Sequence, residues 1–163
     1  MRPRVYVETT IPSYLTAWPS RDVIRAAHQL LTRQWWESSR SDFELVVSQL
    51  VLDECAAGDA EAATARLALL EGIPVLAATD PVIGLAAAIV SDLALPPRAA
   101  NDAVHIAIAA VHGVEYLLTW NCTHIANAVF RSRIAAACAA AGFRSPEIAT
   151  PEQLLKEVPD VGR

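Results

Sequence analysis

Short apolar runs alternate with longer helical patterns along the whole chain. Apolar runs that predict strands fall at residues 5–7, 45–47, 75–77, 116–118 and 148–150. Between them the apolar residues recur at helical spacing, as Leu85, Ala86, Ile89 and Leu93 do. Strands that alternate with helices are typical of a parallel sheet with helices on both faces. The pattern therefore predicts an α/β domain.

The first long helix shows the clearest stripe. Ser20 is expected to cap it, and its apolar residues follow the spacing i, i+4, i+7, i+8 and i+12. They are Val23, Ala27, Leu30, Leu31 and Trp35. This spacing predicts an amphipathic helix whose stripe packs on the core. A shorter helix with a proline in its first turn is expected over residues 11–15.

Polar caps and glycine stops predict the next helices. Ser48 is suited to cap a helix that runs through Ala57 and stops at Gly58. Asp59 is suited to cap the one after it. Later helices are expected from residue 79 and over residues 125–141, and a last short one opens at residue 151. We expect a single domain over residues 1–155 and a frayed tail over residues 156–163.

The segment of residues 99–127 combines a buried helix, a strand and a polar turn. Residues 103–111 are apolar almost all round, which is typical of an interior helix. Asp102 stands at its start, where the helix dipole favours a carboxylate. A glycine stop and the strand 116–118 follow, and the chain then becomes polar at Thr119 and Asn121. Ligands of an open α/β sheet bind outside the carboxyl ends of its strands, so this turn is a candidate site.

Composition restricts the class of protein. A chain of 163 residues, 53% of them hydrophobic, fits one compact domain. No apolar stretch reaches the roughly 18 residues that a membrane span needs. Three cysteines without paired spacing favour reduced thiols and a cytoplasmic location. The net charge of −5 gives no basic field for nucleic acid.

Several familiar sites are excluded by their motifs. The six scattered glycines form no dinucleotide or phosphate loop, and Lys156 is the only lysine. His-Glu-x-x-His, Cys-x-x-Cys and Gly-x-Ser-x-Gly are absent. The four histidines lack metal-ligand spacing. We expect His105 to be a satisfied helix residue and His124 to lie at the edge of a site.

Acids at the ends of elements are the remaining candidates. Glu8 ends the first strand, Glu54 lies on a short apolar helix and Asp102 heads the buried helix. Asp53 points about 100° away from Glu54 on the helix and is expected to face solvent. Clustered carboxylates repel unless a cation lies among them, and few carboxylates with many waters suit Mg²⁺ or Mn²⁺. A metal site is therefore one hypothesis, and solvent-facing acids are the other.

Four segments carry a resemblance to a known family. They are residues 5–10 (Val-Tyr-Val-Glu-Thr-Thr), 48–54 (Ser-Gln-Leu-Val-Leu-Asp-Glu), 101–109 (Asn-Asp-Ala-Val-His-Ile-Ala-Ile-Ala) and 117–125 (Leu-Leu-Thr-Trp-Asn-Cys-Thr-His-Ile). In order and spacing the chain resembles the PIN-domain nucleases, and among them the VapC-type toxins of bacterial toxin–antitoxin pairs. The resemblance implies a three-layer α/β/α sandwich with a central parallel sheet of four to five strands. It also implies a Mg²⁺- or Mn²⁺-dependent endoribonuclease, a cognate antitoxin that blocks the cleft, and a homodimer.

The family's acidic set maps by position onto this chain. It implies Glu8, Glu54, Asp102 and Asn121 as catalytic residues, with Glu8 and Asp102 in contact with the metal. Glu54 would hold a water or act as a base. Thr9 and Thr119 would orient water or phosphate, as would Asn121.

Aromatic and basic residues suggest where a partner would bind. Arg21, Arg25, Arg98 and Arg131 are candidates for the rim of the cleft. Tyr14, Trp18, Trp35 and Trp36 are candidates for base stacking or for an antitoxin helix. We expect at least two of these aromatic residues to lie instead in the core or in a dimer interface.

Two departures from the family pattern keep a second function open. The family's first acid is usually Asp, and here it is Glu8; its fourth is often Asp, and here it is Asn121. A PIN-like module that binds RNA or protein without cutting is therefore an alternative. A receiver-like phospho-acceptor domain ranks last, because that fold needs a lysine after a late strand.

Overall fold

The structure is a computed structural model, and it describes residues 1–156. Five strands form one sheet in the order β3-β2-β1-β4-β5, and every pairing is parallel. The strands are β1 (Arg4–Val7), β2 (Glu44–Ser48), β3 (Val75–Leu76), β4 (Tyr116–Leu118) and β5 (Glu147–Ala149). The predicted strands are confirmed to within a residue or two at their ends.

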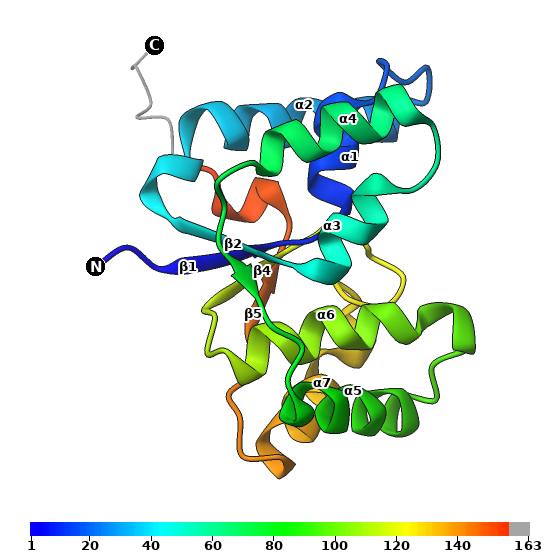
Figure 1. Cartoon of the computed structure of the whole chain (residues 1–163), viewed down its shortest axis with the longest axis vertical. Helices are drawn as coiled ribbons and strands as arrows, with labels where there is room; N and C mark the ends of the chain where they lie inside the picture. The colour runs from blue at the N-terminus through cyan, green and yellow to red at the C-terminus, as the bar shows by residue number, and fades with distance from the viewer. Residues whose placement is uncertain (157–163) are drawn as a thin grey trace.

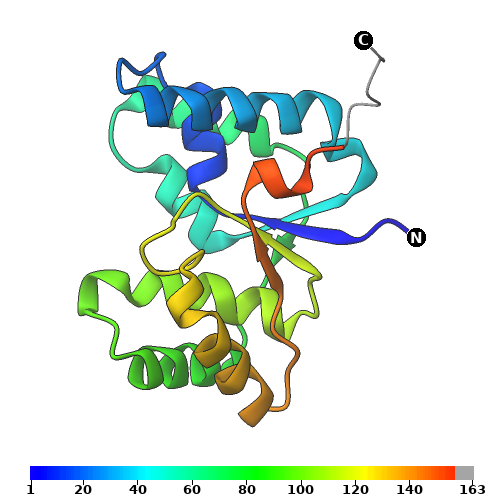
Figure 2. The same cartoon turned by 180° about the vertical axis from the view of Figure 1, so that it is seen from behind.

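Helices cover both faces of this sheet. Those on one face are α1 (Thr10–Thr16), α2 (Val23–Ser38) and α4 (Ala60–Leu70), and those on the other are α5 (Asp80–Leu93), α6 (Ala100–Val111) and α7 (Ala128–Ala140). Figures 1 and 2 show these two groups above and below the sheet. The helix α3 (Gln49–Ala56) continues directly from β2. This arrangement is the predicted three-layer α/β/α sandwich.

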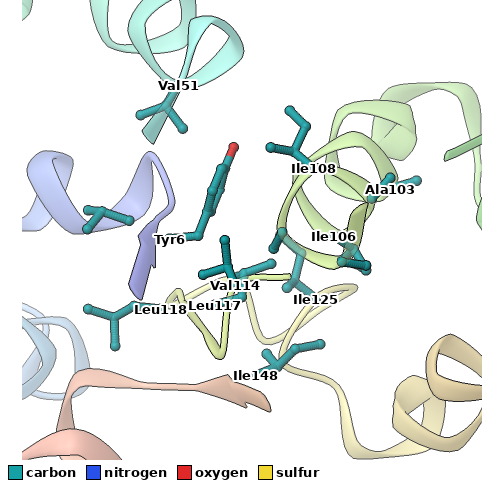
Figure 3. Packing of buried hydrophobic residues seen from close by; sticks show 14 of the residues in the cluster. Tyr6, Val51, Ala103, Ile106, Ile108, Val114, Leu117, Leu118, Ile125 and Ile148 are labelled. Carbon is teal, nitrogen blue, oxygen red and sulfur yellow. The ribbon is translucent and has the colours of Figure 1, made fainter. Parts of the chain in front are cut away.

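The core lies on both faces of the sheet, between the central strands and the helices that cover them. Tyr6 on β1 pairs with Leu117 on β4, and both side chains are fully buried. In Figure 3 they lie among Ile106 and Ile108 of α6. The predicted stripe of α5 is also confirmed, because Leu85, Ala86, Ile89 and Leu93 are all buried. Interior packing of this kind fixes β1 in the middle of the molecule.

Local capping follows the sequence closely at α3 and α4. The Ser48 side chain accepts a hydrogen bond from Val51 N, and the Asp59 side chain accepts one from Ala62 N. Gly58, between the two helices, has a φ of +85°, a value that residues other than glycine rarely adopt. The predicted starts of these two helices are therefore confirmed.

The prediction for α2 is wrong in its cap and in its buried face. Asp22, not Ser20, caps the helix and accepts a hydrogen bond from Arg25 N. Of the predicted stripe, Val23 is 82% and Leu30 is 54% exposed, Ala27 is also exposed, and only Trp35 is fully buried. The buried residues are Gln29, Thr32, Trp35 and Trp36.

Hydrogen bonds explain why polar residues of α2 face inward. Gln29 donates to the carbonyl of Trp18 and accepts from Ser20 N, which ties down the loop before the helix. Thr32 Oγ1 accepts from Trp120 Nε1 at 2.6 Å. Burying a polar group costs little folding free energy when the group has a hydrogen-bond partner. The spacing of hydrophobic residues in the sequence carries no information about such pairs.

Three other expectations change at the level of boundaries. The helix α7 begins at Ala128, with the Asn127 side chain as its cap, and not near residue 125. The last helix is a single 3₁₀ turn, Pro151–Leu154. Within residues 1–156 no helix is long and apolar enough to cross a membrane, and Cys55, Cys122 and Cys138 are free thiols. The expected frayed tail lies outside the described residues, apart from Lys156.

Exchanging polarity at two neighbouring positions of α2 tests which face is buried. We expect Gln29→Leu to lower the free energy of unfolding by about 1–3 kcal/mol, because it leaves the Ser20 amide without its acceptor. Leu30→Gln is expected to change it by less than about 0.5 kcal/mol, because Leu30 is exposed. Urea unfolding of both variants measures the difference. A larger loss of unfolding free energy in Leu30→Gln than in Gln29→Leu would show that the face predicted from hydrophobic spacing is the buried one.

Candidate active site

The candidate site lies where two neighbouring strands end. In the order β3-β2-β1-β4-β5, chain direction across the sheet changes between β1 and β4, and such a switch point is where open α/β sheets bind ligands. Glu8 follows β1, and Thr119 follows β4. Glu8 N donates to the carbonyl of Leu118 at 3.1 Å, so the two strand ends are held side by side.

Glu8 is a buried acid whose two carboxylate oxygens differ in their hydrogen-bond partners. Its side chain is only 5% exposed. Three donors reach Oε2: Thr10 N at 3.1 Å, Thr10 Oγ1 at 2.5 Å and Thr119 Oγ1 at 2.8 Å. No donor among residues 1–156 reaches Oε1. Donors of this kind stabilise the charged carboxylate, and its second oxygen remains available as an acceptor.

Glu54 on α3 faces the same place from the other side of β1. Its Oε1 accepts from Thr9 Oγ1 at 2.7 Å and lies 2.7 Å from His105 Nε2. Burial raises the pKa of Glu54, but the hydrogen bonds of His105, Thr9 and Asn101, with the charge that His105 carries when it is protonated, outweigh burial and leave the pKa below its usual value. The carboxylate is therefore ionised at neutral pH.

Asp53 behaves as the sequence predicts. Its side chain is exposed and accepts a hydrogen bond from Gln49 Nε2 at 2.8 Å on the same helix. It therefore lies outside the site and provides a matched control for changes at Glu54 and Asp102.

Asp102 lies in the first turn of α6, and both of its oxygens have partners. Asn121 Nδ2 donates to Oδ1 at 2.9 Å, and His124 Nδ1 lies 2.8 Å from Oδ2. The Asn121 side-chain oxygen in turn accepts from His124 N at 3.2 Å. The turn after β4 is thus fastened to the start of α6, and His124 lies at the edge of the site as predicted.

The Glu8 and Asp102 halves of the site are joined by one threonine. Thr119 Oγ1 accepts from Asn121 N at 2.9 Å and donates to Glu8 Oε2. Thr10 makes a similar bridge, because its hydroxyl donates to Glu8 and accepts from Trp120 N at 2.8 Å. Glu8, Thr119, Asn121 and Asp102 therefore belong to one hydrogen-bond network, in which the hydroxyls of Thr10 and Thr119 hold Glu8. Glu54 and Thr9 form a separate hydrogen-bonded pair beside it.

The donor atoms closest to one another differ from the predicted metal pair. Glu8, Glu54 and His105 each offer a ligand atom, and these atoms lie within 4.8 Å of one another. In the described part of the chain Asp102 does not join such a group. Carboxylate oxygens are hard ligands of the type that Mg²⁺ and Mn²⁺ prefer.

His105 and Thr10 are the contacts that the sequence analysis did not assign to the site. His105 was expected to be an ordinary satisfied helix residue, and it is indeed 1% exposed with both ring nitrogens partnered. Its position three residues after Asp102, on the same face of α6, was the available signal. Thr10 directly follows the predicted pair Glu8 and Thr9, so adjacency alone did not separate its role from that of Thr9.

A cavity of about 450 Å³ adjoins Glu8 through Thr10. Its wall includes Thr10, Tyr14, Trp18 and Arg25. Trp18 is 92% exposed and presents a free aromatic face. Among the other candidates, Trp35 and Trp36 are buried in the core, as expected for at least two of the four aromatic residues. The side chains of Arg21, Arg98 and Arg131 are exposed and do not line this cavity.

Comparison with known proteins identifies a family and a fold. A family model described as "PIN domain" matches residues 5–121, which is more than half of the chain. Among solved structures, a chain of "VapBC2 from Rickettsia felis bound to a DNA fragment from their promoter" superposes with a TM-score of 0.53. That match has 13% sequence identity and covers 90% of this chain and 98% of the other, so it shows a shared fold. No curated protein matches.

The low pKa of Glu54 makes stability depend on pH. A carboxyl whose pKa falls on folding stabilises the protein above its ordinary pKa of 4.5, and this contribution disappears as pH falls through the lower folded value. We expect Glu54→Gln to lower the free energy of unfolding by about 1 kcal/mol at pH 7, and this difference to shrink below pH 4.5. Urea unfolding between pH 7 and pH 3 measures it.

Glu37→Gln, at an exposed position of α2, is the control for general loss of charge. It is expected to leave the pH profile of stability close to that of the unaltered protein. A Glu54→Gln difference that stays constant or grows on acidification would contradict the assigned direction of the pKa.

Proposed function

The chain belongs to the PIN-domain family, a family of nucleases, and from this we propose that it is a Mg²⁺- or Mn²⁺-dependent endoribonuclease and the toxin of a toxin–antitoxin pair. The observation that carries the proposal is Glu8, a buried acid with one oxygen saturated by donors and the other left available. A second carboxylate, Glu54, lies within 4.8 Å of it. Two acids gathered at a switch point are costly without a cation.

The residues present fit a hard divalent cation. Glu8 and Glu54 offer carboxylate oxygens, and Asp102 is linked to Glu8 by the hydrogen bonds of Asn121 and Thr119. We expect Glu8 and Asp102 to hold the metal, with Glu54 beside them. Such an ion, when bound, activates water for attack and stabilises negative charge on the phosphodiester.

The remaining chemistry belongs to the side chains. The low pKa of Glu54 makes it a weak base, so we assign it to holding and orienting a water rather than to removing its proton. Thr9 fixes Glu54 through its hydroxyl, and Thr10 and Thr119 fix Glu8. Thr9 and Thr119 therefore act by holding the carboxylates, a role one step removed from the predicted contact with water or phosphate.

Asn121 and His124 complete the site around Asp102. Both place a side-chain nitrogen within hydrogen-bond distance of that carboxylate, so they hold it without adding negative charge. We propose that Asn121 orients Asp102, where the family often has a fourth acid. Asn121 then remains part of the site, where its neutral side chain acts by holding Asp102 in place.

We propose that the neighbouring cavity receives the RNA substrate beside Glu8. Trp18 and Tyr14 offer aromatic faces for unpaired bases, and Arg25 offers a cation for the phosphate backbone. Thr10 belongs both to this cavity and to the Glu8 network, so a strand bound there passes next to the carboxylates. An overall charge of −5 makes such local contacts necessary.

The exposed apolar face of α2 is the proposed surface for a cognate antitoxin. Val23, Ile24 and Leu30 of this helix, together with Trp18 in the loop before it, are 54–92% exposed. An amphipathic segment laid on this face would also cover Trp18, at the mouth of the cavity. Antitoxin and RNA would then compete for one aromatic residue, which is a simple basis for inhibition. A homodimer remains a further proposal from the family, and Val129 and Ile83 are exposed apolar residues elsewhere on the surface.

The second candidate function is a PIN-like module that binds RNA or protein without cleaving it. The observation in its favour is that both oxygens of Asp102 already have hydrogen-bond partners, in Asn121 and His124. A cleavage assay with and without metal separates it from the nuclease.

Removing the charge of Asp102 tests the nuclease directly. The unaltered protein should cleave single-stranded RNA with Mg²⁺ or Mn²⁺ and stop when a chelator is added. Asp102→Asn should lower the rate by roughly 100-fold or more, the scale of losing one charge-stabilising group, while keeping the fold. Asp53→Asn, exposed on α3, should retain the rate. Metal-independent cleavage, or equal rates in the two variants, would count against the proposal.

Placing the family's acid at position 121 tests the assignment of Asn121. Asn121 Nδ2 lies 2.9 Å from Asp102 Oδ1, so Asn121→Asp sets two carboxylates against each other in the metal-free protein. We expect a lower melting temperature without metal and tighter Mn²⁺ binding in calorimetric titration. Asn121→Ala should impair cleavage less than Asp102→Ala. Equal or weaker Mn²⁺ affinity in Asn121→Asp would place Asn121 outside the metal site.

A further inference from the structure

A chain of buried polar groups runs from the end of β2 to Glu54. Ser48 Oγ lies 2.7 Å from the Tyr6 hydroxyl, and that hydroxyl lies 2.7 Å from His105 Nδ1. The other ring nitrogen, Nε2, lies 2.7 Å from Glu54 Oε1. Ser48, Tyr6 and His105 are each at most 1% exposed, so solvent does not supply alternative partners.

The partners of each atom determine the order of the hydrogens. Ser48 Oγ accepts from Val51 N at 3.3 Å, and among the described residues the Tyr6 hydroxyl is the one acceptor within reach of its own hydrogen. The Tyr6 hydroxyl then donates to His105 Nδ1, and Nε2–H donates to Glu54. In the reverse order the Ser48 hydrogen has no acceptor among the described residues, and a buried unpaired donor is costly. Burial also raises the pKa of Tyr6, which keeps the phenol protonated.

Hydrophobic packing holds the Tyr6 ring in this position. Figure 3 shows the ring standing between Val51 of α3 and Ile108 of α6, with its oxygen pointing between the two helices. Both neighbours are buried side chains of the core. The hydroxyl therefore sits at a fixed point, and His105 packs edge-on to the ring with centroids 5.7 Å apart.

We propose that Tyr6 and Ser48 are positioning residues, which fix His105 as the Nε2–H tautomer so that His105 holds Glu54 in place. His105 then serves the carboxylate rather than a metal, because neither ring nitrogen keeps a free lone pair. Loss of the Tyr6 hydroxyl releases Nδ1, and the alternative tautomer turns a bare nitrogen lone pair toward the Glu54 carboxylate. The link from Glu54 to metal binding rests on the proposed function, whereas the tautomer does not.

Nitrogen-15 NMR of the histidine rings in the metal-free protein tests the tautomer. We expect His105 of the unaltered protein to show a protonated Nε2 and an unprotonated Nδ1. In Tyr6→Phe this pattern should be lost or mixed, and in Tyr116→Phe it should persist. Tyr116 lies on the neighbouring strand β4, opposite Val5, and its hydroxyl makes no hydrogen bond within residues 1–156. A protonated Nδ1 in the unaltered protein would overturn the proposal without any variant.

Calorimetric titration of Mn²⁺ tests the consequence for Glu54. Tyr6→Phe should bind Mn²⁺ roughly 10-fold or more weakly, the scale for loss of a group outside the direct ligands, because a displaced Glu54 no longer holds the water beside the ion. His105→Gln retains a donor toward Glu54 but not the imidazole acceptor for Tyr6. In that background Tyr6→Phe should therefore have little further effect. If Tyr6→Phe keeps both the Mn²⁺ affinity and the His105 tautomer of the unaltered protein, the positioning role is wrong.

The two proposals fail in distinguishable ways. If the unaltered protein neither binds Mn²⁺ nor cleaves RNA, the nuclease proposal fails, and the NMR result alone decides the tautomer. A different result would show that His105 is a metal ligand and that the positioning role is wrong. In that case the unaltered protein binds Mn²⁺ and cleaves RNA, and His105→Gln loses more Mn²⁺ affinity than Tyr6→Phe does. The tautomer of His105 in Tyr6→Phe is then the same as in the unaltered protein.

Discussion

A carboxylate kept out of water at the end of the central strand imposes the main constraint on this structure. Glu8 is 5% exposed, and an ionised group at such a position is costly unless donors surround it. Thr10 and Thr119 supply those donors from the two sides of the β1–β4 boundary. Because both hydroxyls are committed to one oxygen, the other oxygen is left available for the proposed cation.

The topology delivers the remaining groups to the same place. With β1 in the middle of a parallel sheet, the carboxyl ends of β2 and β4 flank Glu8, and α6 packs below them. Glu54 arrives on the helix that follows β2, and His105 arrives from α6. Each acid is therefore held by residues from a different segment of the chain.

Much of this arrangement was predictable from the sequence, and the failures have a common physical cause. Strand positions, the caps Ser48 and Asp59, and the acids at element ends follow from local pattern and family resemblance. The buried face of α2 and the role of His105 do not, because both depend on polar partners distant in sequence. Gln29 faces inward because its side chain donates to the carbonyl of Trp18 and accepts from Ser20 N. Hydrophobic spacing carries no information about such pairs.

The central claim is that the available oxygen of Glu8 receives a divalent cation. A crystal structure of the protein grown with Mn²⁺, with anomalous diffraction recorded near the manganese edge, tests it most directly. We expect a single strong anomalous peak within bonding distance of Glu8 Oε1, with His105 Nε2 still hydrogen-bonded to Glu54. A well-ordered site without a peak, or a peak bonded to His105 Nε2, would contradict it.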